Sequence, residues 1–92
     1  MNPALDTAKL AIGRGFRLQW EAVQNSHVLL YPEGMVKLNG SAGEILSRCD
    51  GKRTTTEIVA DLEGAYGTTG LSEDVTAFVM FALASKWLEI RS

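Results

Sequence analysis

The hydrophobic pattern of this chain changes from a two-residue period to a helical period near its middle. From residue 14 to residue 21 apolar and polar positions alternate, with Phe16, Leu18 and Trp20 on one side, which predicts a half-buried strand. Residues 28–31 and 35–38 are two further short runs rich in β-formers and large apolar residues. The turn sequence Y-P-E-G at residues 31–34 lies between them, so this half predicts a three-stranded antiparallel sheet.

A first helix is predicted directly after the sheet. The sequence S-A-G-E at residues 41–44 matches a capping box, in which serine and glutamate satisfy free backbone donors at a helix start. Gly51 is placed to end this helix in a left-handed conformation. The apolar stripe at helical spacing consists of Ala42, Ile45, Leu46 and Cys49.

A second helix is predicted after a short exposed connector at residues 52–53. The sequence T-T-T-E at residues 54–57 offers a second capping box. The loop G-T-T-G at residues 67–70 follows this helix, and weak strand propensity returns only at residues 87–90. The stripe that this helix is expected to bury consists of Ile58, Val59, Leu62 and Tyr66.

The third predicted helix is apolar on nearly every side. Ser72 is its expected N-cap, and Glu73 and Asp74 place negative charge in its first turn. One stripe is formed by Val75, Phe78, Val79 and Ala82, and the opposite side carries Ala77, Met80, Phe81 and Ala84. Two alternatives follow for the second side. Either other elements cover it as ordinary core, or it lines a binding groove in which Met and Phe supply adaptable contacts.

Composition limits the class of protein. Ninety-two residues suit one domain, here divided into an N-terminal arm (residues 1–13) without clean periodicity and a domain over residues 14–92. Nine basic and eleven acidic residues give a formal charge of −2, which argues against binding to nucleic acid. The single Cys49 suits a reducing, cytoplasmic compartment. The longest apolar run, residues 77–84, is too short to cross a membrane.

Candidate catalytic chemistry is sparse. The single His27 lies in a predicted strand, where a surface or packing role is the simpler interpretation, and Cys49 lies in an apolar helical stripe. With one His and one Cys, no metal-ligand spacing exists, so we expect neither a metal nor an enzyme. The one concentrated basic patch, at the end of the first helix, consists of Arg48, Lys52 and Arg53. It either complements the helix C-terminus or docks an acidic partner surface.

The predicted architecture is α+β and winged helix-turn-helix-like, with a three-stranded antiparallel sheet followed by three helices. One hypothesis is a DNA-binding regulator. It is poorly supported, because the second helix carries Glu57, Asp61 and Glu63 and no basic residue. The other hypothesis is a peptide-binding module, in which a peptide adds to an open sheet edge beside an apolar helix. The same open edge also predicts a homodimer formed by edge pairing or by exchange of an element.

Several ordered sequence blocks resemble the PqqD family (pyrroloquinoline quinone biosynthesis protein D, a precursor-peptide recognition element). The blocks are R-G-F-R-L-Q-W-E at residues 14–21, H-V-L-L-Y-P-E-G-M-V-K-L-N at 27–39, S-A-G-E-I-L-S-R-C-D-G-K-R-T at 41–54 and T-E-I-V-A-D-L at 56–62. The resemblance implies a chaperone that binds the precursor peptide PqqA and presents it to the radical SAM enzyme PqqE. It also implies that the chain itself holds no iron–sulfur cluster and no other cofactor.

The resemblance further implies where the peptide lies, between the third strand and the third helix. The corresponding positions are Met35, Val36, Lys37 and Leu38 on the strand and Val75, Phe78, Val79, Phe81 and Ala82 on the helix. The block R-C-D-G at residues 48–51 also matches the family. It therefore adds Asp50 to the basic patch as a candidate contact with the partner enzyme, with helix termination as the alternative role.

Overall fold

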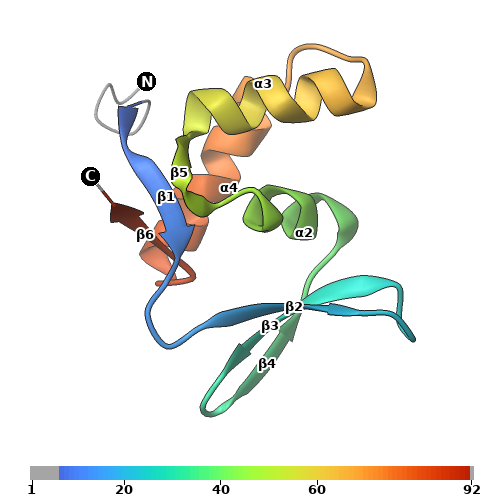
Figure 1. The fold of residues 1–92 in the computed structure, drawn as a ribbon, viewed down its shortest axis with the longest axis vertical. Coiled ribbons are helices and arrows are strands. Elements are labelled where there is room, and N and C mark those ends of the chain that lie inside the picture. The colour runs from blue at the N-terminus through green and yellow to red at the C-terminus, as the bar shows by residue number, and fades with distance from the viewer. Residues whose placement is uncertain (1–6, 92) are drawn as a thin grey trace.

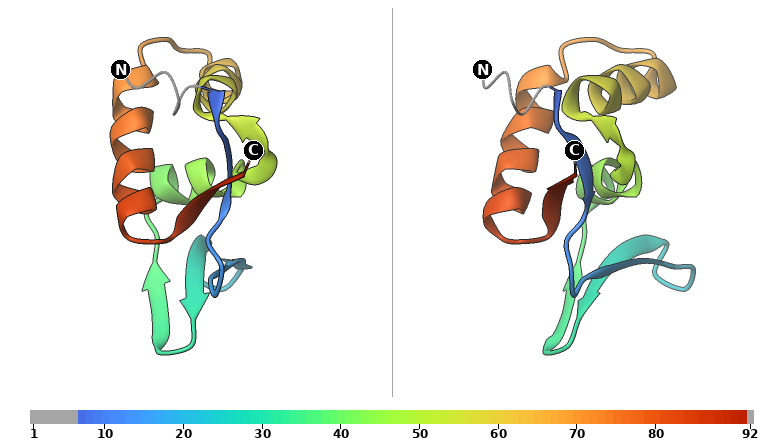
Figure 2. Two further views of the ribbon diagram at one scale, coloured as in Figure 1. Left: turned by 90° about the vertical axis from the view of Figure 1, so that its left-hand side faces the viewer. Right: turned by 60° about the vertical axis from the view of Figure 1, so that its left-hand side comes forward.

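The computed structural model describes residues 7–91 and has two small sheets (Figure 1). One sheet has the strand order β2-β3-β4, and the other has the order β5-β1-β6, with every pairing antiparallel. The first sheet projects from one end of the molecule, while the helices and the second sheet form the other end (Figure 2). The α+β class is confirmed, and the winged helix-turn-helix likeness stays a prediction. The elements are β1 (Lys9–Ile12), β2 (Arg17–Glu21), β3 (Ser26–Tyr31), β4 (Gly34–Lys37), α2 (Gly40–Ser47), β5 (Asp50–Thr54), α3 (Thr55–Tyr66), α4 (Ser72–Ala84) and β6 (Leu88–Arg91).

The predicted three-stranded sheet is confirmed as β2, β3 and β4. Leu29 of β3 lies opposite Leu18 and Val36, so these three side chains share one face. Leu29 is fully buried in the main core together with residues of α2, while Leu18 and Val36 pack against that core. The alternating pattern therefore predicted the face that packs on the core correctly at Leu18, whereas Trp20 on the same side is 51% exposed.

The helix α2 begins earlier than predicted. The Oδ1 atom of Asn39 accepts a hydrogen bond of 2.8 Å from the amide of Ala42, so Asn39 is the N-cap and the expected capping box is wrong. Asn is as favourable an N-cap as Ser, and Asn39 precedes Ser41 in the segment that follows β4. The carboxylate of Glu44 instead pairs with Arg48 at 2.8 Å. The predicted stripe is confirmed, because all four of its members are buried: Ala42, Ile45, Leu46 and Cys49.

The second sheet was not expected from the sequence. β1 occupies residues assigned to the N-terminal arm, and Leu10, opposite Arg53 and Ile90, is fully buried. Residues 1–6 of that arm lie outside the described residues. The predicted connector at residues 52–53 is part of β5. Gly51 has a φ of 82° there and does not end α2, whose C-cap is Arg48.

The end of β1 is held against the turn that follows α4. The amide of Gly13 donates a 2.7 Å hydrogen bond to the carbonyl of Trp87. A Cβ atom at Gly13 would lie 2.0 Å from the carbonyl oxygen of Lys86, so only glycine fits without a backbone shift. β6 follows this turn directly, which confirms the strand propensity at residues 87–90.

The helix α3 has the predicted start. Thr54 and Glu57 form the capping box through hydrogen bonds of 3.2 Å and 2.9 Å in the two directions. Ile58, Val59 and Leu62 are buried as predicted. Tyr66 is 59% exposed, so its assignment to the buried stripe is wrong. It is the last residue of the helix, beyond the turns that the core covers.

The helix α4 starts without a side-chain cap. Leu71 holds the N-cap position in an αR conformation, so the expected Ser72 cap is wrong. The amide of Leu71 donates to the carboxylate of Glu63 at 3.0 Å, which joins the start of α4 to α3. Glu73 and Asp74 lie in the first turn as predicted.

A contact between α2 and β3 generates the first prediction. A Cβ atom added at Gly43 would lie 2.6 Å from Nδ1 and 3.1 Å from Cβ of His27. We therefore expect Gly43→Ala to lower the free energy of unfolding by about 1–3 kcal/mol through overpacking. Urea denaturation followed by circular dichroism measures this change. Gly64→Ala is the matched helical control, because its Cβ would meet nothing within 4 Å. Equal losses in the two variants would contradict the prediction.

Candidate functional site

The strand β4 is an edge strand with its outer side free of other described strands. The amide of Leu38 donates to the carbonyl of His27 at 3.1 Å, which makes this a hydrogen-bonded pair of the antiparallel ladder. Such pairs alternate, so the backbone groups of Val36 point toward β3 as well. Those of Met35 and Lys37 point outward. β4 can therefore form main-chain hydrogen bonds with an added strand at Met35 and Lys37.

The helix α4 and the strand β4 lie on the same side of the molecule (Figure 2), and part of the apolar surface of α4 is exposed. Met80 is 58% exposed and Phe81 is 55% exposed. The ring of Phe81 packs edge-on against Trp87 with centroids 5.2 Å apart, and Phe78 lies 6.4 Å from each of these two rings. The prediction that other elements cover the second side of this helix as ordinary core is therefore wrong. An aromatic cluster held by Trp87 faces solvent instead.

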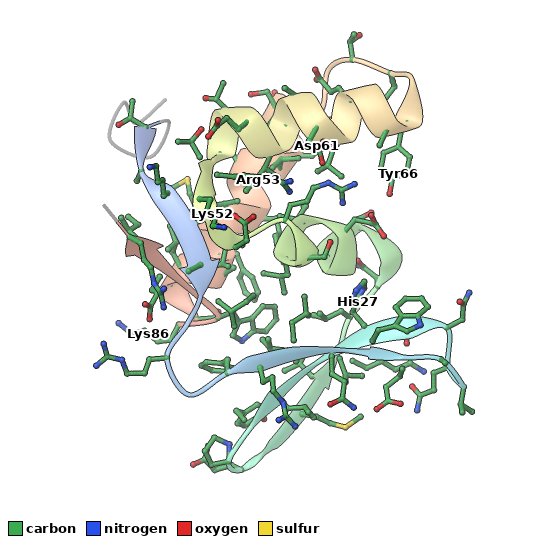
Figure 3. All side chains as sticks on the ribbon, viewed as in Figure 1. His27, Lys52, Arg53, Asp61, Tyr66 and Lys86 are labelled. Atoms are coloured by element: carbon green, nitrogen blue, oxygen red, sulfur yellow. The ribbon has the colours of Figure 1, made fainter. Side chains whose placement is uncertain are left out.

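A cavity of about 380 Å³ lies between the first turns of α2, the last turn of α3 and the first turns of α4. Figure 3 shows Tyr66 pointing from the end of α3 toward the α2 side, where this cavity lies. Three separate helices form the cavity, so no local sequence pattern indicated it, and most of its residues were missed as site residues. Its lining consists of Asn39, Ser41, Ala42, Glu44, Ile45, Leu62, Tyr66, Thr68, Leu71, Asp74, Val75 and Phe78.

The nine predicted peptide-binding residues divide into two groups. Met35 and Phe81 are more than half exposed, Lys37 is exposed, and Val36 and Phe78 are half-buried, so these five can contact a ligand. The other four belong to the core and hold the surface in place: Leu38, Val75, Val79 and Ala82. A direct role in binding stays a prediction for all nine.

The predicted docking residues do not form one free basic surface. Arg48 is paired with Glu44 and, through Nε, with Asp61, so it joins α2 to α3. The hydrogen bond with Glu44 is the largest of the effects that raise the pKa of Arg48, and burial opposes it. Lys52 and Arg53 lie on β5 (Figure 3), where Lys52 is exposed and Arg53 half-buried.

The remaining docking residue, Asp50, is the first residue of β5, and its side chain is bonded to the backbone of that strand. Its Oδ1 atom accepts a 2.9 Å hydrogen bond from the amide of Lys52. The carboxylate therefore has a local partner in β5. Contact of any of the four docking residues with a partner enzyme stays a prediction.

The two residues with nucleophilic or acid–base potential are placed for packing. Burial raises the pKa of the Cys49 thiol to about 12, with a smaller effect from Asp50, so the thiol is protonated at neutral pH. His27 is half-buried and packs edge-on against Trp20 with ring centroids 4.9 Å apart, as a packing residue would. Within residues 7–91 no cluster of acidic, His and Cys residues has a geometry that suits a metal ion. No helix in that range is long and apolar enough to span a membrane.

Comparison with known proteins gives consistent matches in sequence. The family model for coenzyme PQQ synthesis protein D (PqqD) matches residues 26–88. The PqqA binding protein of Stutzerimonas stutzeri (strain A1501) is 54% identical over 79 residues, which cover 85% of this chain and 86% of that protein. The PqqA binding protein of Pseudomonas aeruginosa (strain UCBPP-PA14) is 50% identical over 90 residues, which cover 97% of each chain.

Solved structures agree with these matches. The solution NMR structure of the PqqD truncation of Methylobacterium extorquens PqqCD, a stand-alone RiPP recognition element, is similar with a TM-score of 0.67 and 32% identity over 87% of each chain. The heterocyclase TruD shares the fold, with a TM-score of 0.69 and 21% identity. The matched region covers 91% of this chain and 12% of the TruD chain. The family model, the curated relatives and the fold together show that this chain belongs to the PqqD family.

Proposed function

We infer that this protein is a peptide chaperone of pyrroloquinoline quinone biosynthesis, which binds the precursor peptide PqqA and presents it to the radical SAM enzyme PqqE. The observation that carries the proposal is the outward-pointing backbone of β4, on the same side of the molecule as α4, which carries the partly exposed aromatic cluster. The names of the relatives, PqqA binding protein, supply the identity of the peptide.

The proposed binding mode divides affinity and selectivity between two elements. The outward N–H and C=O groups of Met35 and Lys37 pair with the peptide backbone, which is independent of sequence. Phe81 and the half-buried Phe78 and Trp87 contact its side chains. The rings are already packed against one another, so little side-chain entropy is lost when a peptide covers them.

A non-catalytic role in the cytoplasm is part of the same proposal. The protonated thiol of Cys49 and the packed His27 support a protein that presents its ligand without modifying it. A free, buried cysteine also suits a reducing compartment. The DNA-binding alternative has no support, because neither α3 nor α4 has a basic residue in its last turn and α3 carries Glu57, Asp61 and Glu63.

The first test of this function is a binding titration. Synthetic PqqA of Pseudomonas aeruginosa should bind the protein saturably, whereas a DNA duplex of equal concentration should not. Isothermal titration calorimetry measures both. Mass spectrometry of the recovered peptide should show an unchanged mass. Absence of PqqA binding, or a covalent change in the peptide with this protein alone, would overturn the proposal.

A proline substitution tests strand addition at β4 directly. Lys37→Pro removes an outward N–H and should leave a folded protein, while Val36→Pro removes an N–H that bonds to β3 and should disrupt the sheet. Loss of one hydrogen bond worth about 0.5–1.5 kcal/mol predicts a roughly two- to tenfold weaker affinity of Lys37→Pro for PqqA. Lys37→Ala is the control, since it removes the side chain and keeps the N–H.

The outcomes of this series are distinct. Binding by folded Lys37→Pro that is as tight as that of Lys37→Ala would mean that β4 does not pair with the peptide.

We also propose that the same edge forms the homodimer. Saturating PqqA should then compete with self-association in sedimentation experiments, and a dimer population unaffected by peptide would place dimerisation elsewhere.

The aromatic cluster gives a prediction that separates binding from stability. Phe81→Ser should weaken PqqA binding and change the free energy of unfolding by less than about 1 kcal/mol, because the ring is mainly exposed. Phe78→Ser should cost more stability, up to the roughly 3–5 kcal/mol typical of buried Phe truncation, because Phe78 packs against the core. Thermal unfolding and peptide titration measure the two effects. Equal stability losses would mean that Phe81 is a core residue.

A further inference from the structure

The cavity between α2, α3 and α4 shares Phe78 with the proposed peptide site. Asn39, which lines it, is the second residue after the end of β4. Phe78 lines the cavity and also packs against the ring of Phe81. A peptide that leaves the edge of β4 near Lys37 therefore arrives at the mouth of the cavity. Its volume of about 380 Å³ lies within the range of about 300–1,000 Å³ typical of ligand pockets.

The lining of the cavity has a definite chemistry. Half of its twelve lining residues are aliphatic or Phe, and no Lys or Arg lines it. Two carboxylates, those of Glu44 and Asp74, belong to the lining. Glu44 is already paired with Arg48, whereas Asp74 forms no ion pair with any residue in the described range 7–91. The exposed carboxylate of Asp74 is thus available to a cation that enters with the ligand.

The two helix N-termini at the cavity do not favour an anion. A free helix start attracts negative charge, but here one backbone donor near each start already has a side-chain acceptor. The side chain of Asn39 accepts from the first turn of α2, and the carboxylate of Glu63 accepts from the amide of Leu71 at the start of α4. Glu73 and Asp74 add negative charge within the first turn of α4. The balance of charge at the mouth therefore favours a cationic group.

We propose that this cavity is an anchor pocket for one large apolar side chain of the precursor peptide, and that Asp74 at its mouth selects a peptide in which a Lys or Arg lies beside that anchor. The proposal rests on the proposed function, since the occupant is the same peptide. It adds a determinant that strand pairing cannot supply, because backbone hydrogen bonds do not distinguish one sequence from another.

A charge reversal tests the selection by Asp74. Asp74→Lys should weaken binding of fluorescein-labelled Pseudomonas aeruginosa PqqA by about two- to tenfold at low salt, since it replaces an attraction by a repulsion. The difference should shrink in 0.5 M NaCl. Glu73→Lys is the matched control. It makes the same charge change in the same helical turn and outside the lining, so it should weaken binding clearly less than Asp74→Lys does.

A substitution that fills the cavity tests the anchor. Ser41 is exposed and lies in the lining within the first turn of α2, so Ser41→Trp should occupy the space and weaken PqqA binding by about tenfold or more. Ser47→Trp is the control at the exposed end of the same helix, outside the lining, and it should bind as the parent does. Circular dichroism confirms that both variants are folded.

Peptide variants complete the test. PqqA peptides in which each Lys or Arg is changed in turn to Glu should include one that binds the parent more weakly and binds Asp74→Lys more tightly than unmodified PqqA does. If Asp74→Lys and Glu73→Lys are equivalent, or no peptide restores binding, the selection by Asp74 is wrong. If folded Ser41→Trp binds as the parent, the anchor pocket is wrong. In these cases the proposed function stands, whereas a parent protein that does not bind PqqA would overturn the function and the pocket together.

Discussion

The close contact between the end of β1 and the turn after α4 is the constraint on which the rest of the structure depends. Gly13 reaches the backbone of Lys86 and Trp87 so closely that no side chain fits between them. On one side of this contact the chain continues into the β2–β3–β4 sheet. On the other side lie α4 and its aromatic cluster. The relative position of β4 and α4, the two parts of the proposed peptide site, therefore depends on a backbone contact of Gly13 with the turn that carries Trp87.

A second constraint holds the three helices around the cavity. Arg48 bridges Glu44 of α2 and Asp61 of α3, and Glu63 of α3 accepts a hydrogen bond from the start of α4. In these polar contacts Arg48 is the C-cap of α2 and Leu71 the N-cap of α4, while Ile45, Leu62 and Val75 belong to the buried core. The cavity is thus formed by elements that are already joined to one another. A preformed pocket reduces the ordering cost of binding, which suits a protein whose peptide ligand must itself become ordered.

An open edge strand is usually a risk of aggregation, and this fold limits that risk. β4 has only four residues and carries the charged Lys37 on its outward-pointing register. Short edges and lysine residues both disfavour pairing between copies of a chain. The same features leave two outward residues for a peptide, so in the proposed binding mode the remaining selectivity comes from side chains on α4 and around the cavity. Cys49 is buried in the core, and His27 packs against Trp20.

The sequence by itself determined the features that depend on neighbours within a few residues. The alternation of Leu18 and Trp20, the hairpin at residues 28–38, the capping box of Thr54 and Glu57 and the stripe of α2 all follow from local periodicity or local hydrogen bonds. The family resemblance was visible for the same reason, since it consists of these blocks in order, and the match over residues 26–88 bears it out.

Only the tertiary structure decided what depends on partners distant in the sequence. β1 pairs with strands about 40 and 80 residues away, so its short apolar run carried no local signal of a central strand. Asn39 and Ser41 are both good caps, and the position where the chain leaves the sheet selected between them. The outward register of β4, the exposure of Phe81 and the cavity beside Asp74 likewise arise from the way separate elements pack. Local propensity does not contain this information, because the same residues fit several arrangements until distant contacts choose one.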